Sequence, residues 1–280
     1  MARKAPFRER TKRRIAIAGG RLRRTLSRSG RANRIVFLHM PKCGGTSLSE
    51  ALYATVPLSE RIGVIDAIST RRAAAILRFG RDDPQLCHED LDEGHRTFAL
   101  REGLMLQHMA WDTAMIHGHL LWSERADAHF GETYDYVTLL RDPVARTLSN
   151  YRMARRTGAT EEEFGPWLEG PMARRQARVF LRYLSGSNDI AEDEVADALA
   201  RARARLARFA VIGFLDRLPS FERAFAARYG VRPSPARLNS APDRDGGPAP
   251  TDAQVARLRE LCAPDMDLWE AARAAPGAAL

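Results

Sequence analysis

The chain has 280 residues, of which 45% are hydrophobic and 28% are charged, fractions that are ordinary for a soluble globular protein. They exclude a wholly disordered chain and a polytopic membrane protein, and the length suffices for one large α/β domain or two small ones. The unusual quantity is the formal net charge of +9, from 44 Lys and Arg against 35 Asp and Glu.

The positive charge is concentrated at the N-terminus. Residues 1–34 hold 13 Lys and Arg and one acid, Glu9, whereas the other 246 residues carry 31 basic and 34 acidic side chains. We expect residues 1–33 to form a flexible, solvated basic arm and residues 34–280 to form one domain. Such an arm could bind an anionic membrane surface. Nucleic acid is the less favoured partner, because the domain itself is close to neutral.

Cysteine use and apolar runs indicate the compartment. Cys43, Cys87 and Cys262 are odd in number and far apart, so they predict neither a disulfide framework nor a structural zinc site. The longest apolar run near the N-terminus, residues 15–18, is too short for a signal peptide or a transmembrane helix. We therefore expect a cytoplasmic protein. Its basic arm could hold it at the periphery of a membrane.

Short runs of β-branched and aromatic residues alternate with helical patterns along the chain. Strands are expected at 34–40, 114–122, 134–140 and 210–215, and helices follow them at 46–54, 123–129, 144–156 and 220–229. Further helices are expected at 71–79, 164–184, 192–209, 251–262 and 267–274. The topology of 58–110 stays open, and 232–250 is expected to be a long loop. The repeated strand-to-helix transitions predict a single α/β domain with a mainly parallel central sheet flanked by helices.

A glycine-rich turn, within residues 39–47, joins the first strand to its helix. Its two glycines allow backbone N–H groups to converge on an anion, and the N-terminus of the helix favours phosphate. Lys42 adds a mobile cation, and Thr46 and Ser47 add hydroxyl donors. A Walker A loop has its lysine after the glycines, but Lys42 precedes them, which argues against an ordinary ATPase. A turn that merely connects strand and helix is the alternative.

The third strand ends in a second candidate anion site. Arg141 follows the strand as a fork-shaped donor, and Ser149 lies about two turns into the next helix, where it can face the same pocket. An Arg-Asp-Pro sequence is also a common strand-ending turn. This pattern alone does not decide between the two interpretations.

Two histidines, His117 and His119, stand at the end of the second strand. Residues at i and i+2 of a strand point the same way, so the pair could begin a metal site. No third ligand stands out in the sequence, so we expect no metal. A histidine pair in the core or on the surface is the remaining structural interpretation.

Together these motifs resemble those of the sulfotransferases that use 3′-phosphoadenosine 5′-phosphosulfate. The segment 41–48, Pro-Lys-Cys-Gly-Gly-Thr-Ser-Leu, is similar to their 5′-phosphosulfate loop, and 139–151 is similar to their 3′-phosphate motif. The His-Gly-His segment 117–119 looks like that of the carbohydrate branch, the heparan and uronyl 2-O-sulfotransferases. Cys43 departs from the family pattern, in which threonine is usual at this position.

The resemblance implies a P-loop-like nucleotide-binding core and a set of site residues. His119 would be the catalytic base, with His117 as its neighbour in the catalytic site, and Lys42 would neutralise the leaving oxygen. The donor would be held by Lys42, Cys43, Gly44, Gly45, Thr46 and Ser47 at its 5′-phosphate and by Arg141 and Ser149 at its 3′-phosphate.

The activity implied by the resemblance is transfer of a sulfuryl group from 3′-phosphoadenosine 5′-phosphosulfate, the co-substrate, to a hydroxyl group of a carbohydrate or glycoconjugate. The acceptor would be a glycan or a glycolipid, and no metal cofactor is expected. Two alternatives remain. The first is a nucleotide-dependent kinase or NTPase, which would require magnesium-binding carboxylates. The second is a nucleotide-binding protein without catalytic activity.

Overall fold

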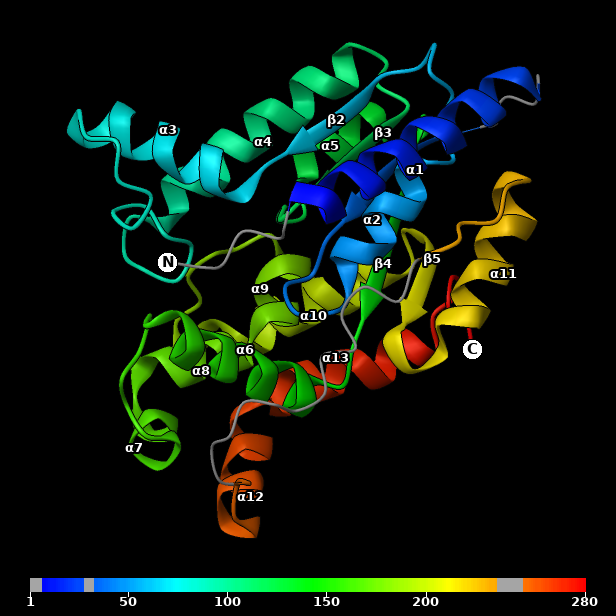
Figure 1. Cartoon of the computed structure of the whole chain (residues 1–280). Coiled ribbons are helices and arrows are strands. Elements are labelled where there is room, and N and C mark those ends of the chain that lie inside the picture. The colour runs from blue at the N-terminus through cyan, green and yellow to red at the C-terminus, as the bar shows by residue number, and fades with distance from the viewer. Residues whose placement is uncertain (1–6, 28–32, 236–248) are drawn as a thin grey trace.

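Five short strands form the centre of the protein (Figure 1). The computed structural model describes residues 7–27, 33–235 and 249–280. Its strands are β1 (Arg34–Leu38), β2 (Ile62–Ile65), β3 (Met115–Gly118), β4 (Tyr134–Leu140) and β5 (Phe209–Phe214). All pair in parallel, in the order β2-β3-β1-β4-β5. The predicted α/β domain with a mainly parallel sheet flanked by helices is confirmed.

Helices cover both faces of the sheet, because alternate strand residues point to opposite sides. Ile35 and Phe37 of β1 pack against one layer, and Val36 and Leu38 pack against the other. The first layer contains α2 (Gly45–Tyr53) and α11 (Leu218–Tyr229). The second contains α4 (Gly94–Ala110), α5 (Glu124–Phe130), α9 (Val179–Ser185), α10 (Val195–Leu206) and α13 (Ala263–Arg273).

The structure assigns the segment 58–110, which contains the edge strand β2, α3 (Ala67–Phe79) and α4. The expected single helix at 164–184 is wrong. It is α7 (Phe164–Glu169), α8 (Pro171–Ala177) and α9, because the backbone of Gly170 is extended and Pro171 starts a new helix.

Besides the N-terminal helix described below, the described residues also form α6 (Pro143–Thr157), α12 (Asp252–Leu261) and short 3₁₀ turns at Glu192–Glu194 and Leu215–Arg217. Most of the loop expected at 232–250, residues 236–248, lies outside the described residues. Over the described ranges, no helix combines the length and the apolar composition that a membrane span requires.

The basic N-terminal segment contains a helix, α1 (Phe7–Leu26), which packs along α2 (Figure 1). The flexibility expected for residues 1–33 stays a prediction. Arg21 donates hydrogen bonds to three backbone carbonyls beyond the end of α2, at 3.2, 3.0 and 2.7 Å. A Cβ at Gly20 would lie 2.5 Å from the Cβ of Ala54, so only glycine permits this approach. The domain boundary before residue 34 stays a prediction.

The strand order creates a switch point beside β1. From β1 the chain continues to β2 on one side of the sheet, whereas from β4 it continues to β5 on the other side. In open α/β sheets, ligands bind at the carboxyl ends of the strands where adjacent loops depart in opposite directions. The turns after β1 and β4, which carry two of the predicted motifs, are the loops at this point.

Candidate active site

The turn between β1 and α2 has the backbone geometry of an anion-binding loop. Lys42 and Gly44 both adopt a left-handed backbone, with φ of 65° and 76°. This conformation is uncommon for lysine, and such strained positions cluster at functional sites. Gly44 is the N-cap of α2, so the first N–H groups of the helix and its positive dipole end face the turn. The turn can therefore hold a phosphate or sulfate group.

Cys43 points into the core and not into this turn. Its side chain has no exposed surface, and its Sγ lies 3.7 Å from the Pro41 carbonyl. Burial raises the pKa of the Cys43 thiol to about 12. Its N–H already donates to the Met40 carbonyl at 3.4 Å. The side chain of Cys43 thus serves packing, and the predicted contact of residue 43 with the donor stays a prediction.

Lys42 and Arg141 lie next to each other at the switch point. The Nη1 of Arg141 donates to the Lys42 carbonyl at 3.4 Å, and the Lys42 Nζ lies 3.3 Å from the Met153 Sδ of α6. Ser149 stands one helical turn before Met153 on the same face of α6. The structure thus brings the turn, Arg141 and Ser149 to one end of the sheet. The side chain of Thr46 lies outside the described part, so its predicted contact stays a prediction.

Local sequence fixes where α6 begins, and so where Arg141 points. Asp142 caps the helix by accepting a hydrogen bond from the Ala145 N–H at 2.7 Å, and Pro143 occupies the first turn. The chain therefore turns sharply after β4. Arg141 stays at the strand end, where its guanidinium reaches the turn after β1.

Three histidines stack beside the turn. His119 directly follows β3, and its ring centroid lies 4.4 Å from that of His39, which directly follows β1. The His39 ring lies in turn 5.0 Å from that of His117. The parallel register pairs Leu38 with Gly118, so these strand ends bring the three side chains together.

Hydrogen bonds set the protonation of this cluster. The Nδ1 of His119 lies 2.8 Å from the His39 carbonyl, which only accepts, so Nδ1 carries the proton and Nε2 keeps its lone pair. Both ring nitrogens of His117 have partners, the Tyr53 hydroxyl at 2.8 Å and the His39 Nδ1 at 3.1 Å. The Nε2 of His119 has no such partner among the described residues. It is therefore the nitrogen that can accept a proton from a ligand.

The cluster is neutral at physiological pH. Burial, and then repulsion from the neighbouring histidines, lowers the pKa of His39 well below its usual 6.5. Burial and His119 lower the pKa of His117 to about 3. Burial also lowers the pKa of His119, with a further contribution from Arg101, while the hydrogen bond to the His39 carbonyl opposes this shift. Neutral imidazole is the form that acts as a general base.

A buried ion pair supports the turn after β3. Arg101 of α4 has no exposed surface, and its Nη1 donates to the His119 carbonyl at 3.0 Å. Its Nη2 pairs with Glu89, which also binds Arg71. Burial would raise the pKa of Glu89, but the two arginines lower it to about 2, so the carboxylate stays ionised. Removing one member of such a buried group costs about 3–5 kcal/mol.

Sequence patterns single out His117 and His119 but not their partners His39, Tyr53 and Arg101. The role of His39 has a signal, because it follows the first strand as His119 follows the second, and neighbouring parallel strands end side by side. The sequence carries no signal for the roles of Tyr53 and Arg101. Their contacts depend on how α2 and α4 pack on the sheet.

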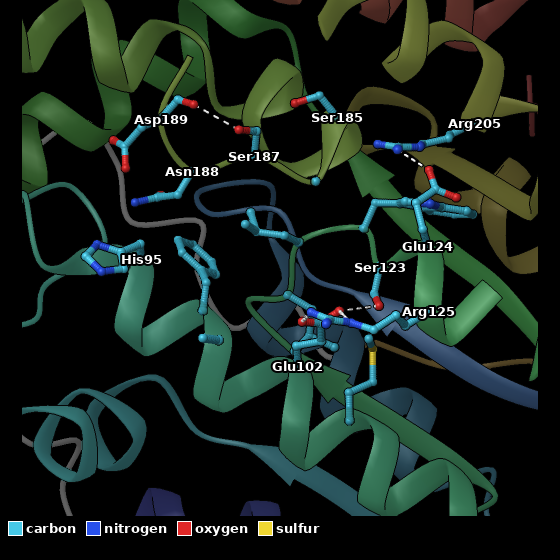
Figure 2. A pocket seen from close by; sticks show the side chains of 17 residues that line it. His95, Glu102, Ser123, Glu124, Arg125, Ser185, Ser187, Asn188, Asp189 and Arg205 are labelled. Carbon is cyan, nitrogen blue, oxygen red and sulfur yellow. Dashed lines mark hydrogen bonds and ion pairs between the residues drawn. The ribbon is translucent and has the colours of Figure 1, made fainter. Parts of the chain in front are cut away.

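A polar cavity of about 590 Å³ lies between α4, the segment 120–125 that follows His119, and the turn 185–189 (Figure 2). Its carboxylates are paired with arginines. The Nε1 of Trp122 and the Nδ2 of Asn188 are buried and have no hydrogen-bond partner among the described residues.

Comparison with known proteins adds no family. No family model matches the sequence, and no curated protein matches it. In the part of the chain that the structure describes, no group of three or more His, Cys, Asp or Glu could hold a metal ion.

The buried histidines predict how stability changes with pH. An unfolded histidine binds a proton below about pH 6.5, whereas folded His117 does so only at about pH 3. Between these values the unfolded state binds more protons, so the free energy of unfolding falls as pH falls. In urea unfolding from about pH 6.5 down to 5, His117 contributes a slope of up to about 1.4 kcal/mol per pH unit.

The variant His117→Gln should show a smaller slope, while the exposed His129→Gln should leave it unchanged. Asp265 acts with the opposite sign, because burial raises its pKa to about 6 and the folded state then binds more protons above pH 4. Its contribution is the same in all three proteins and cancels in the comparison. Equal slopes in the wild type and His117→Gln would contradict the neutral cluster.

Proposed function

We propose that the protein is a sulfotransferase that moves a sulfuryl group from 3′-phosphoadenosine 5′-phosphosulfate to a hydroxyl group of a carbohydrate or glycoconjugate. The observation that carries the proposal is the meeting of the anion-binding turn at Lys42, the strand-end Arg141 and the neutral His119 at the carboxyl ends of adjacent strands. The resemblance of the three motifs to those of sulfotransferases supports it. A P-loop-like nucleotide-binding core is part of the same proposal.

The two phosphate groups of the donor match two sets of protein groups. The 5′-phosphate would accept hydrogen bonds from the N–H groups at the start of α2 and from the Ser47 hydroxyl. The 3′-phosphate would bind the Arg141 guanidinium and the Ser149 hydroxyl. Because these sets lie after β1 and β4, they would hold the nucleotide across the switch point.

The reaction forms a sulfur–oxygen bond to the acceptor and breaks the one between sulfur and the 5′-phosphate oxygen. Lys42 would neutralise the charge that develops on the leaving oxygen. The Nε2 of His119 would take the proton of the acceptor hydroxyl, so the products are a sulfate ester and adenosine 3′,5′-bisphosphate. The imidazolium then returns the proton to solvent. Positioning and electrostatics suffice for such a transfer, as in phosphoryl transfer.

The lowered pKa of His119 suits this role. Without donor, burial keeps the ring unprotonated at neutral pH, so it is ready to accept a proton. The negative charges of a bound donor would raise the pKa of His119, because nearby opposite charge stabilises imidazolium. The base would thus gain strength when the donor is in place.

The polar cavity is not lined by His119, Lys42 or Arg141, so it is separate from the proposed transfer site. Its volume of about 590 Å³ is within the range of sites for small ligands.

Replacing Arg141 with alanine should weaken binding of adenosine 3′,5′-bisphosphate. Hydrogen bonds to charged groups contribute about 1.5–3 kcal/mol, so we expect a loss of about ten- to a hundredfold in isothermal titration calorimetry. The matched control is Arg259→Ala, which removes an exposed arginine of α12. Wild-type affinity in Arg141→Ala would contradict the 3′-phosphate site. Tight binding of magnesium ATP with indifference to the 3′-phosphate would favour the kinase alternative.

Replacing Gly44 with alanine tests the turn itself. Gly44 and Gly158 have similar positive φ, 76° and 71°, so each alanine should cost about 1–2 kcal/mol of stability in urea unfolding. A Cβ at Gly158 meets nothing within 4 Å, whereas one at Gly44 would lie 2.7 Å from the Leu215 Cδ1. Only Gly44→Ala should also weaken bisphosphate binding, because it displaces the turn. Unchanged affinity in that variant would exclude the turn from the donor site.

Replacing His119 with alanine should retain binding of the bisphosphate but slow sulfuryl transfer by at least about a hundredfold, the contribution of a general base. Transfer of labelled sulfate from the donor to a panel of glycans measures this rate. The exposed His129→Ala is the control and should keep the wild-type rate. Equal rates in the wild type and His119→Ala would remove His119 from the catalytic role.

A further inference from the structure

Helix α1 is held against the domain by one face. Gly20 lies against Ala54 of α2, and Arg21 donates to three carbonyls that follow α2. The Thr25 hydroxyl accepts a hydrogen bond from the Leu58 N–H at 2.7 Å. These contacts fix the rotation of the helix about its own axis, so the opposite face is turned to solvent.

That opposite face carries an apolar row, here called the outer stripe: Ile15, Ala18, Leu22 and Leu26. The side chains of Ile15, Leu22 and Leu26 are 66%, 50% and 74% exposed. Ile15 and Leu22 are seven residues apart, which is two turns of helix, and Leu22 and Leu26 are four residues apart, which is one turn. The three side chains therefore lie on one line along the axis. Single exposed apolar residues are ordinary, but an aligned exposed row indicates an interaction surface.

Cations flank the outer stripe on both sides. At about 100° per residue, Lys12 and Arg23 lie on one side of it and Arg14 on the other. All three are exposed, and none of them forms an ion pair with a described residue. The arginines of α3 differ, because they are paired with acids, as Arg72 is with Asp82. Helix α1 thus presents uncompensated positive charge beside apolar side chains.

We propose that the outer stripe and its flanking cations dock the protein on an anionic lipid bilayer, with α1 lying in the plane of the interface. Apolar side chains of such a helix enter the boundary between headgroups and acyl chains, and the long Lys and Arg stems reach the lipid phosphates beside them. Each cation near an anionic surface adds to the attraction.

The charge of the helix favours an anionic bilayer over a second copy of this chain as the binding partner. Residues 1–34 hold 13 Lys and Arg and one acid, so a second copy of this helix would be repelled. A single apolar row with cations on both flanks matches a laterally uniform anionic surface, which needs no residue-by-residue complement. The docking is also separate from the proposed activity, because none of these side chains belongs to the phosphate turn or to the histidine cluster.

Flotation of the full chain with vesicles tests the proposal. One set of vesicles is phosphatidylcholine alone, and the other contains about one third phosphatidylserine. We expect the chain to float with the second set only, and to be released as salt is raised, because screening weakens the attraction.

Two double variants separate the contributions. Ile15→Gln with Leu22→Gln should lower the partition coefficient at least about tenfold, because it removes apolar area that the interface would bury. The matched control is Ile68→Gln with Leu77→Gln on α3, whose side chains are 57% and 78% exposed, and it should bind as the wild type does. Arg14→Gln with Arg23→Gln should also lower binding about tenfold or more, through charge alone.

Three results would overturn the proposal: no flotation with phosphatidylserine vesicles, equal flotation without phosphatidylserine, or wild-type binding by the outer-stripe variant. Circular dichroism and the urea midpoint establish that each variant is folded. If the outer-stripe variant does not fold, the charge variant and the salt dependence decide alone. Wild-type binding by the charge variant would then exclude an anionic bilayer.

Discussion

Parallel pairing of β1 with β3 on one side and β4 on the other is the constraint on which the site depends. Parallel strands end at the same edge of a sheet, so the turns after these three strands must meet there. Lys42, His119 and Arg141 are far apart in the chain, yet each follows one of the three strands. A slip of one residue in the pairing of β3 would turn His117 and His119 to the other face. The turn after β1 and the two histidines would then separate.

Burial at this edge decides which groups carry charge. The stacked His39 and His117 have few polar contacts outside the cluster, so desolvation keeps them neutral. Arg101 has no exposed surface, and it pairs with Glu89 and donates a hydrogen bond from Nη1 to a backbone carbonyl. The result is a neutral ring system at the ends of β1 and β3, beside cations that follow β1 and β4. That division suits a reaction in which one side holds phosphate and the other removes a proton.

Neither the turn after β1 nor the histidine cluster accounts for the net charge of the chain. It is concentrated in residues 1–34, and α1 holds much of it outside the α2 layer (Figure 1). Charge density indicates a solvated tail, but hydrogen bonds from Arg21 to backbone carbonyls and the close approach at Gly20 dock the helix without a large apolar contact. The face left outward is the one that carries the outer stripe. The proposed membrane contact of the outer stripe therefore depends on how α1 packs on α2, and not on charge alone.

The amino-acid sequence by itself determined the features that depend on neighbours along the chain. It specified four of the five strands, all but β2, together with the glycine turn. It also specified helix starts such as Ser123, which accepts the Ala126 N–H, and Thr251 in its capping box. Only the tertiary structure decided strand order, the entry of His39 into the histidine cluster and the docking of α1. Those outcomes depend on contacts between segments many residues apart, and period and propensity carry no information about which distant segments meet.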